Sequence, residues 1–133
     1  MTELTKTEQR HHDLRQRLID IAALQIAADG ASSLKARDLA ARAGCAVGAI
    51  YNVFDDMTAL VMQVNLQSFA ALRQVAGDAI RDTAGLDARE QLIRLGQAYL
   101  GFAMAHYHPW RALFEVSTDL AEVPDWYQTA LDQ

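Results

Sequence analysis

Residues that carry out catalysis or bind metal ions are scarce in this sequence and poorly spaced for those tasks. The histidines form two close pairs, His11 with His12 and His106 with His108, and Cys45 is the one cysteine. No Cys or acidic residue completes a metal-ligand spacing around either pair. The chain has no nucleophile motif, no glycine-rich phosphate loop and no recognisable pair of carboxylates. We therefore expect neither an enzyme nor a cofactor or metal site, and we interpret Cys45 as a small hydrophobe packed in the interior.

The most distinctive chemistry lies in the stretch ARAGCAVGAIYNVF, residues 41–54. An alanine-rich helical pattern breaks at Gly44, restarts at once and then becomes bulky and aromatic. Ile50 and Phe54 are four residues apart and point inward together, which leaves Asn52 on the outer side. The amide of an asparagine pairs well with N6 and N7 of adenine. Asn52 is therefore our best candidate for reading a base.

Helical periodicity extends over most of the chain, and the composition agrees with it. Alanine is abundant, β-branched residues are sparse, and 51% of residues are hydrophobic. These features predict an all-α fold. Gly30 ends the first helix, and Ser32 and Ser33 offer an N-cap to the second. The helices are expected at about 13–28, 34–43, 46–54, 58–81, 88–107 and 109–116, with a further one beginning near 125.

Charge and cysteine usage limit the class of protein. The formal net charge is −5, which argues against a general nucleic-acid coat protein but allows basic residues to gather locally. The chain has no apolar run of 18 residues, and its polar N-terminus lacks the apolar core of a signal peptide. A lone Cys45 suits a reducing compartment. These features together predict a cytoplasmic protein with no membrane contact.

Two short helices joined by a brief turn that contains glycine form a helix-turn-helix. Such a break presents the second helix on a rigid support, from which its outer face can enter a DNA major groove. The alternative from spacing alone is a corner between two helices of a bundle that binds no ligand.

Residues 10–60 resemble the N-terminal DNA-binding domain of TetR-type transcriptional regulators. The resemblance runs from the first helix through the "AG" turn and "GAIYNVF" to a closing leucine, and "HHDLR" at 11–15 is similar to a motif of one branch of the family. It implies a three-helix DNA-binding domain at 1–57. "AYLGFAMAHYHPWRALFE" and "VPDWY" resemble pieces of a regulatory domain, which implies that 58–133 is part of a helical ligand-binding and dimerisation domain. Such domains usually continue further, so we expect either a piece of a longer protein or a shortened molecule.

The resemblance also implies which side chains meet DNA. Arg37 lies where the family places a residue that reaches a base or a phosphate, and Tyr51 matches the family's nearly universal tyrosine. The start of the second helix suits a phosphate, although Ser33 is equally well explained by capping alone. A thymine methyl group suits Val47 or Ala49. The predicted DNA-binding residues are Ser33, Lys35, Arg37, Val47, Gly48, Tyr51 and Asn52.

Three positions depart from the family pattern. Ala46 replaces a common serine, Val53 a common histidine and Met57 a common lysine, and all three family residues usually contact phosphates. Acidic residues also slightly outnumber basic ones in 1–58. These departures support a rival hypothesis, in which the chain is a helical interaction module that kept the fold but lost specific DNA binding.

An aromatic stripe in the second half of the chain has two interpretations. Phe102, His106, Trp110 and Phe114 recur at helical spacing, and such a stripe usually belongs to a core. The resemblance instead places a small-molecule cavity among these helices, so we predict these four residues to bind an effector of unknown identity. It further implies a homodimer in the complete protein, whose two recognition helices meet successive major grooves, and a repressor that releases its operator when the effector binds.

Overall fold

The computed structural model describes residues 5–116 and 124–132, and these residues contain helices and connecting turns without a strand. The predicted all-α fold is therefore confirmed. None of the described helices is long and apolar enough to cross a membrane. The elements are α1 (Lys6–Asp29), a 3-10 turn η1 (Ala31–Ser33), α2 (Ala36–Ala43), α3 (Val47–Val53), α4 (Met57–Asp82), α5 (Ala88–Ala105), α6 (Tyr107–Glu115) and α7 (Asp125–Leu131).

The first three helices pack around one apolar core. Leu18 and Ile26 of α1 are fully buried, and Leu39 of α2 and Ile50 of α3 are 2% and 1% exposed. Each of these helices presents one apolar side to the other two, as helical spacing predicts. The burial holds α3 against α1 and α2, so that its opposite side remains accessible.

α1 begins earlier than its apolar pattern predicted. The threonine hydroxyl of Thr5 accepts the amide of Glu8 at 3.1 Å, and the Glu8 carboxylate accepts the amide of Thr5 at 2.9 Å. This capping box stabilises a first turn that has no apolar side chain. Residues 6–13 carry no hydrophobic signal, which is why periodicity placed the start at about 13. Leu24 of α1 is 67% exposed although it is apolar.

The predicted cap of the second helix is wrong. η1 follows Gly30, and the Ser33 hydroxyl donates to the Gly30 carbonyl at 2.7 Å instead of accepting an amide of α2. Lys35 is the N-cap of α2 and makes no side-chain capping bond. The cause is Gly30, whose φ of 88° turns the chain into a tight 3-10 turn and so directs the Ser33 side chain backwards.

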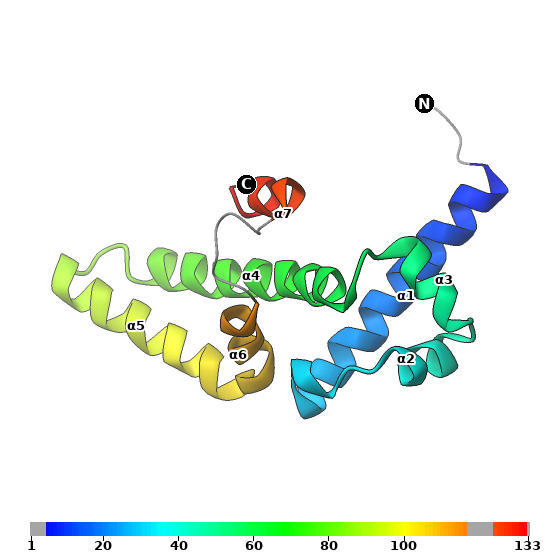
Figure 1. Cartoon of the computed structure of the whole chain (residues 1–133). Helices are drawn as coiled ribbons and strands as arrows, with labels where there is room; N and C mark the ends of the chain where they lie inside the picture. The colour runs from blue at the N-terminus through cyan, green and yellow to red at the C-terminus, as the bar shows by residue number, and fades with distance from the viewer. Residues whose placement is uncertain (1–4, 117–123, 133) are drawn as a thin grey trace.

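The remaining helices assemble along α4, which leaves the N-terminal group and extends across the molecule (Figure 1). Asp56 caps α4 by accepting the amide of Ala59 at 2.8 Å. α5 returns along α4, α6 packs against α1, α4 and α5, and α7 lies on α4. α6 starts two residues before Pro109, because a proline in the first turn of a helix gives up no intrahelical hydrogen bond. α6 thereby contacts α1 of the N-terminal three-helix group as well as the later helices α4 and α5.

Candidate nucleic-acid interface and adjoining cavity

The turn between α2 and α3 requires a glycine for its backbone. Gly44 has φ 71° and ψ 36°, the left-handed conformation. Its amide donates to Ala41 at 3.4 Å, and that of Cys45 donates to Ala40 at 3.0 Å, which closes the end of α2 in a Schellman arrangement. A Cβ at Gly44 would meet nothing within 4 Å. The positive φ, and not lack of space, is therefore what selects glycine here, and it sets the direction of α3.

The outer side of α3 is exposed, as its sequence predicted. Val47 and Tyr51 are 36% and 48% exposed, and Gly48 and Asn52 also lie at the surface. A Cβ at Gly48 would meet nothing within 4 Å, so no contact inside the chain requires a glycine there. With Ala49 half-buried between the two sides, α3 offers solvent a small, uncharged surface with one phenol and one amide.

Polar side chains that the sequence analysis missed hold α2 in place. Arg17 of α1 donates to the carbonyl of Ala43, the last residue of α2, at 2.7 Å. Arg42 donates to the Gln25 side chain at 2.9 Å, and Gln25 donates in turn to the Ser33 hydroxyl at 3.2 Å. Nothing in a helical pattern distinguishes Arg17 and Gln25 from solvated side chains, because their partners are 26 and 8 residues away.

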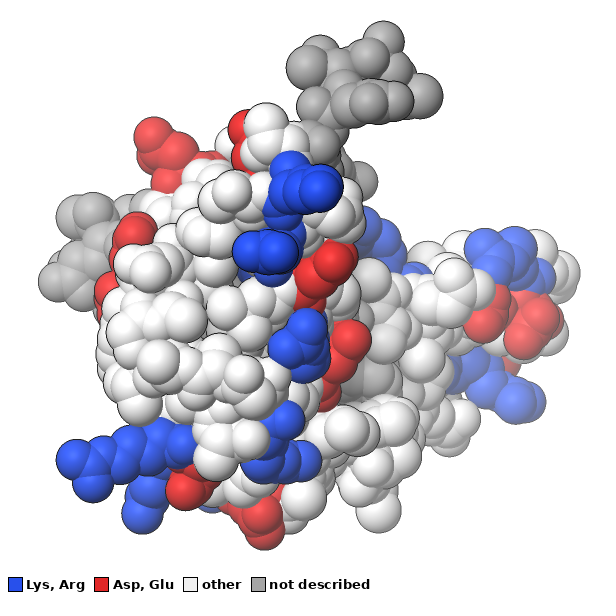
Figure 2. Space-filling model, turned by 90° about the vertical axis from the view of Figure 1, so that its right-hand side faces the viewer, with Lys and Arg blue, Asp and Glu red and all other residues white. Residues whose placement is uncertain are grey.

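Basic side chains lie around this surface and not on it. Lys35 and Arg37 are exposed at the start of α2, and α3 contains no charged residue. Figure 2 shows lysine and arginine side chains bordering a largely uncharged area on the side of the molecule that carries α2 and α3, with some acidic side chains among them. Arg15 lies over the ring of Phe54 at 5.6 Å. This arrangement suits phosphates at the border and base edges in the middle.

The positions that depart from the family pattern have two kinds of environment. Ala46 is the exposed N-cap of α3 and makes no capping bond. Val53 and Met57 are half-buried and pack against the core, as Cys45 also does. Two of the three departures therefore contribute apolar packing at the ends of α3 and α4, and Ala46 alone leaves an exposed position without a polar group.

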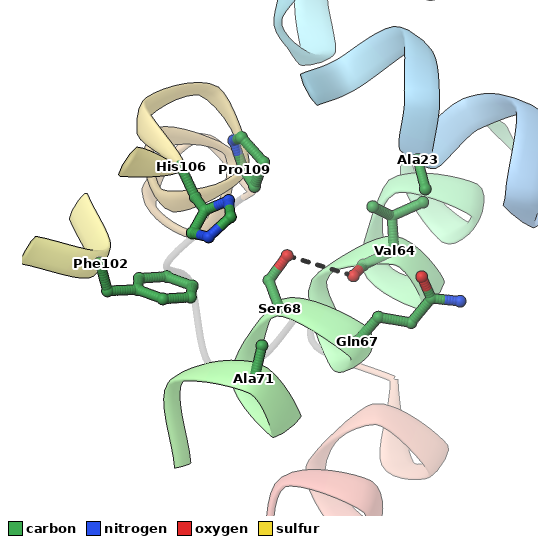
Figure 3. Close-up of a pocket in the computed structure, with 8 residues that line it drawn as sticks. All are labelled: Ala23, Val64, Gln67, Ser68, Ala71, Phe102, His106 and Pro109. Atoms are coloured by element: carbon green, nitrogen blue, oxygen red, sulfur yellow. Dashed lines mark hydrogen bonds between the residues drawn. The ribbon is translucent and has the colours of Figure 1, made fainter. Parts of the chain in front are cut away.

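A cavity lies behind the three-helix group, where α1, α4, α5 and α6 meet (Figure 3). Its volume is about 170 Å³. Ser68 donates to the backbone carbonyl of Val64 at 3.5 Å, so its hydroxyl is partly used within α4. The walls are mainly apolar, and only the side chains of Gln67, Ser68 and His106 can form hydrogen bonds. The lining consists of Ala23, Val64, Gln67, Ser68, Ala71, Phe102, His106 and Pro109.

Two of the four predicted effector-binding residues line this cavity and two do not. Phe102, 6% exposed, and His106 line the cavity. Trp110 and Phe114 do not, since Trp110 donates its indole N–H to the Tyr99 hydroxyl at 2.8 Å and Phe114 is 60% exposed. The chain bends at His106, where φ is −127° and ψ is 53°, so α6 does not continue the stripe of α5. In residues 5–116 and 124–132, no three His, Cys, Asp or Glu side chains gather around a possible metal site.

Comparison with known proteins agrees with this geometry. Residues 18–64, from the middle of α1 to the early turns of α4, match the family model of bacterial regulatory proteins of the tetR family. No curated protein matches the chain. The matched segment includes α2, the Gly44 turn and α3, and so covers the candidate nucleic-acid interface.

Proposed function

We propose that the chain is a ligand-responsive repressor of the tetR family of bacterial regulatory proteins, whose family model matches residues 18–64. The match supports a DNA-binding transcriptional regulator. The ligand-dependent part of the proposal depends on one observation, the cavity that has Ala23 of α1 in one wall and Phe102 and His106 of the later helices in the others. A molecule in that cavity contacts the DNA-binding unit and the second half of the chain at once.

DNA is contacted mainly by α3 in this proposal. The exposed Tyr51 and Asn52 meet base edges or phosphates in the major groove, and Val47 and Gly48 lie closest to the base pairs. Lys35 and Arg37, at the start of α2, meet the phosphate backbone. In a two-fold dimer the two copies of α3 enter successive major grooves about 34–36 Å apart. Ser33 contributes by positioning, because its hydroxyl is bonded to Gly30.

The effector is a small and largely apolar molecule. A closed cavity of about 150 Å³ holds benzene, so a hollow of about 170 Å³ suits a compound of one or two rings. Gln67 and His106 supply hydrogen bonds at its border. An effector that binds one arrangement of α1 and α6 more tightly than another shifts the protein toward that arrangement. Such coupling usually changes the affinity for the second ligand, here DNA, by about 5–150-fold.

A gel-shift screen tests this function. Double-stranded DNA flanking the gene is bound by the protein and challenged with a set of one- and two-ring aromatic compounds. We expect release by a subset, and Phe102→Leu should change which compounds release the DNA because it reshapes the cavity. Phe114→Leu, at an exposed position on α6, is the matched control and should leave that selection unchanged.

Two outcomes would contradict the proposal in different ways. If the protein binds specific DNA but no compound in the set releases it, either from the parent protein or from Phe102→Leu, the cavity has no effector role. A protein that binds the gene-flanking DNA no more tightly than unrelated DNA would favour the rival hypothesis of a helical interaction module.

A further inference from the structure

The first turn of α6 borders the cavity and also packs against α1 of the DNA-binding unit. His106 and Pro109 face the cavity. His108, between them in sequence, is not part of the cavity lining, and its imidazole lies close to Gly30 at the end of α1. A Cβ placed on Gly30 would lie 3.2 Å from Nδ1 of His108 and 3.8 Å from its Cε1. The imidazole therefore occupies the space that a side chain would need, directly against the backbone of Gly30.

Gly30 is linked to α2 by a short chain of hydrogen bonds. Its carbonyl accepts both the amide of Ser33, at 3.2 Å, and the Ser33 hydroxyl, at 2.7 Å. Ser33 accepts from Gln25, which also accepts from Arg42 of α2. A displacement of Gly30 consequently moves η1 and the polar contacts that fix α2, whereas most of α1 is held by its own apolar core.

We propose that His108 is a positioning residue that transmits the state of the cavity to α2. The proposal depends on the effector role of the cavity described above. An occupant that pushes His106 and Pro109 moves the first turn of α6, and the imidazole passes that movement to Gly30 by direct contact. Packed side chains transmit small shifts in this way because they cannot be compressed. The mechanism is steric, so a ring at position 108 is what matters.

A cavity-filling substitution replaces the unidentified effector in the test. Ala71 of α4 lines the cavity, and Ala71→Phe places a ring beside Phe102 and His106. Ala70→Phe is the matched control, because Ala70 and Ala71 are both exposed on the same helix and only Ala71 lines the cavity. Both substitutions are made in the full chain, alone and together with His108→Ala, and amide hydrogen exchange is measured by NMR.

The amides of Ser33 and Leu34 report on the proposed route. They donate to Gly30 and Ala31 across η1 at 3.2 Å each. We expect Ala71→Phe to accelerate their exchange at least about fivefold, the lower end of typical coupling, and Ala70→Phe to leave it within about twofold. In the His108→Ala background the acceleration should disappear. Ala71→Phe combined with His108→Phe should keep the accelerated exchange, because a ring is retained at position 108.

The outcomes separate this inference from the proposed function. Equal acceleration with and without the imidazole, or no acceleration by Ala71→Phe, would overturn the role of His108. The same four proteins are then compared for affinity to gene-flanking DNA. If exchange depends on His108 while DNA affinity does not change in Ala71→Phe, the contact transmits as proposed and the ligand-responsive function is wrong.

Discussion

Asn52 and Lys35 are both exposed beside the turn, but they offer DNA different chemistry. The amide of Asn52 lies on the outer side of α3 and can match a base edge, whereas Lys35 presents a point charge at the start of α2. We predict that Asn52→Ala costs about 1–3 kcal/mol on the preferred DNA and relaxes the choice at one base pair. Lys35→Ala should weaken binding to all DNA sequences alike.

Fluorescence anisotropy on preferred and unrelated DNA checks this pair. Each variant serves as the control for the other, since both remove one polar side chain from an exposed position of the same surface. If Asn52→Ala weakens both DNAs equally, or if Lys35→Ala alters the preferred bases, the two roles are assigned wrongly.

At Gly48 we expect one substitution to have opposite effects on stability and on DNA binding. It lies in the first turn of α3, where a Cβ would meet nothing within 4 Å of the chain. We predict that Gly48→Ala raises the free energy of unfolding by about 0.4–1 kcal/mol, because alanine restricts the unfolded chain and favours helix. The same substitution should weaken DNA binding, since the added methyl group faces the groove. Urea unfolding and anisotropy measure the two effects, and unchanged DNA affinity would contradict a close backbone approach.

Tyr127 of α7 makes the free energy of unfolding depend on pH in the alkaline range. It is 6% exposed, and burial raises the pKa of its phenol above the ordinary value of 10.0, opposed by the nearby side chain of Asn65. The fold thus favours the neutral phenol. This contribution is fully present below the unfolded pKa and is lost as pH rises through the higher folded value. We predict that Tyr127→Phe loses less stability than the parent protein between about pH 9 and 11. Parallel loss in urea titrations of both proteins would contradict this.

The outer side of α5 is apolar and exposed, whereas its inner side packs on α4. Leu92, Leu100 and Met104 are 67%, 60% and 81% exposed, and Phe102 is 6% exposed. We predict that Met104→Glu changes the free energy of unfolding by less than about 0.5 kcal/mol, while Phe102→Ala costs about 3 kcal/mol or more. Thermal and urea unfolding of both variants test this. A large loss in Met104→Glu would mean that this side of α5 is covered in solution.

Elements were predictable where an apolar pattern meets a clear break. Gly44 and Asp56 mark the ends of α2 and the start of α4 by backbone conformation and capping, and both boundaries were predicted within about two residues. The start of α1 and the η1 turn were not, because they are set by hydrogen bonds between Thr5 and Glu8 and from Ser33 to the Gly30 carbonyl, which leave no hydrophobic signal.

The same limit applies to the candidate site. The exposed side of α3 followed from Ile50 and Phe54 alone, since residues four apart share one side of a helix. The cavity lining did not follow from the aromatic stripe, because the bend at His106 separates Phe102 from Trp110. Contacts between distant residues, such as His108 with Gly30, have no local pattern and required the packed molecule.

At the scale of the whole molecule, the distribution of charge determines how DNA binding responds to salt. The chain carries a net charge of −5, so attraction to DNA depends on the basic side chains around α2 and α3. Several of these are already engaged within the fold, Arg17 with Ala43, Arg42 with Gln25 and Arg15 with the ring of Phe54. Lys35, Arg37 and Arg10 have no side-chain hydrogen bond or ion pair within residues 5–116 and 124–132, and we expect them to supply the phosphate contacts.

We therefore predict a moderate salt dependence. Three phosphate contacts per protomer give a slope of log affinity against log salt of about −3 per protomer, or about −5 to −6 for two protomers on one operator. Titrations of the preferred DNA at three salt concentrations measure it. Lys35→Ala should reduce the slope by about one for each protomer bound, whereas Asn52→Ala should leave it unchanged because an uncharged amide releases no counterion. A slope near −10 would mean that the engaged arginines leave their partners to bind phosphates. A flat response would mean that the basic border does not contact DNA.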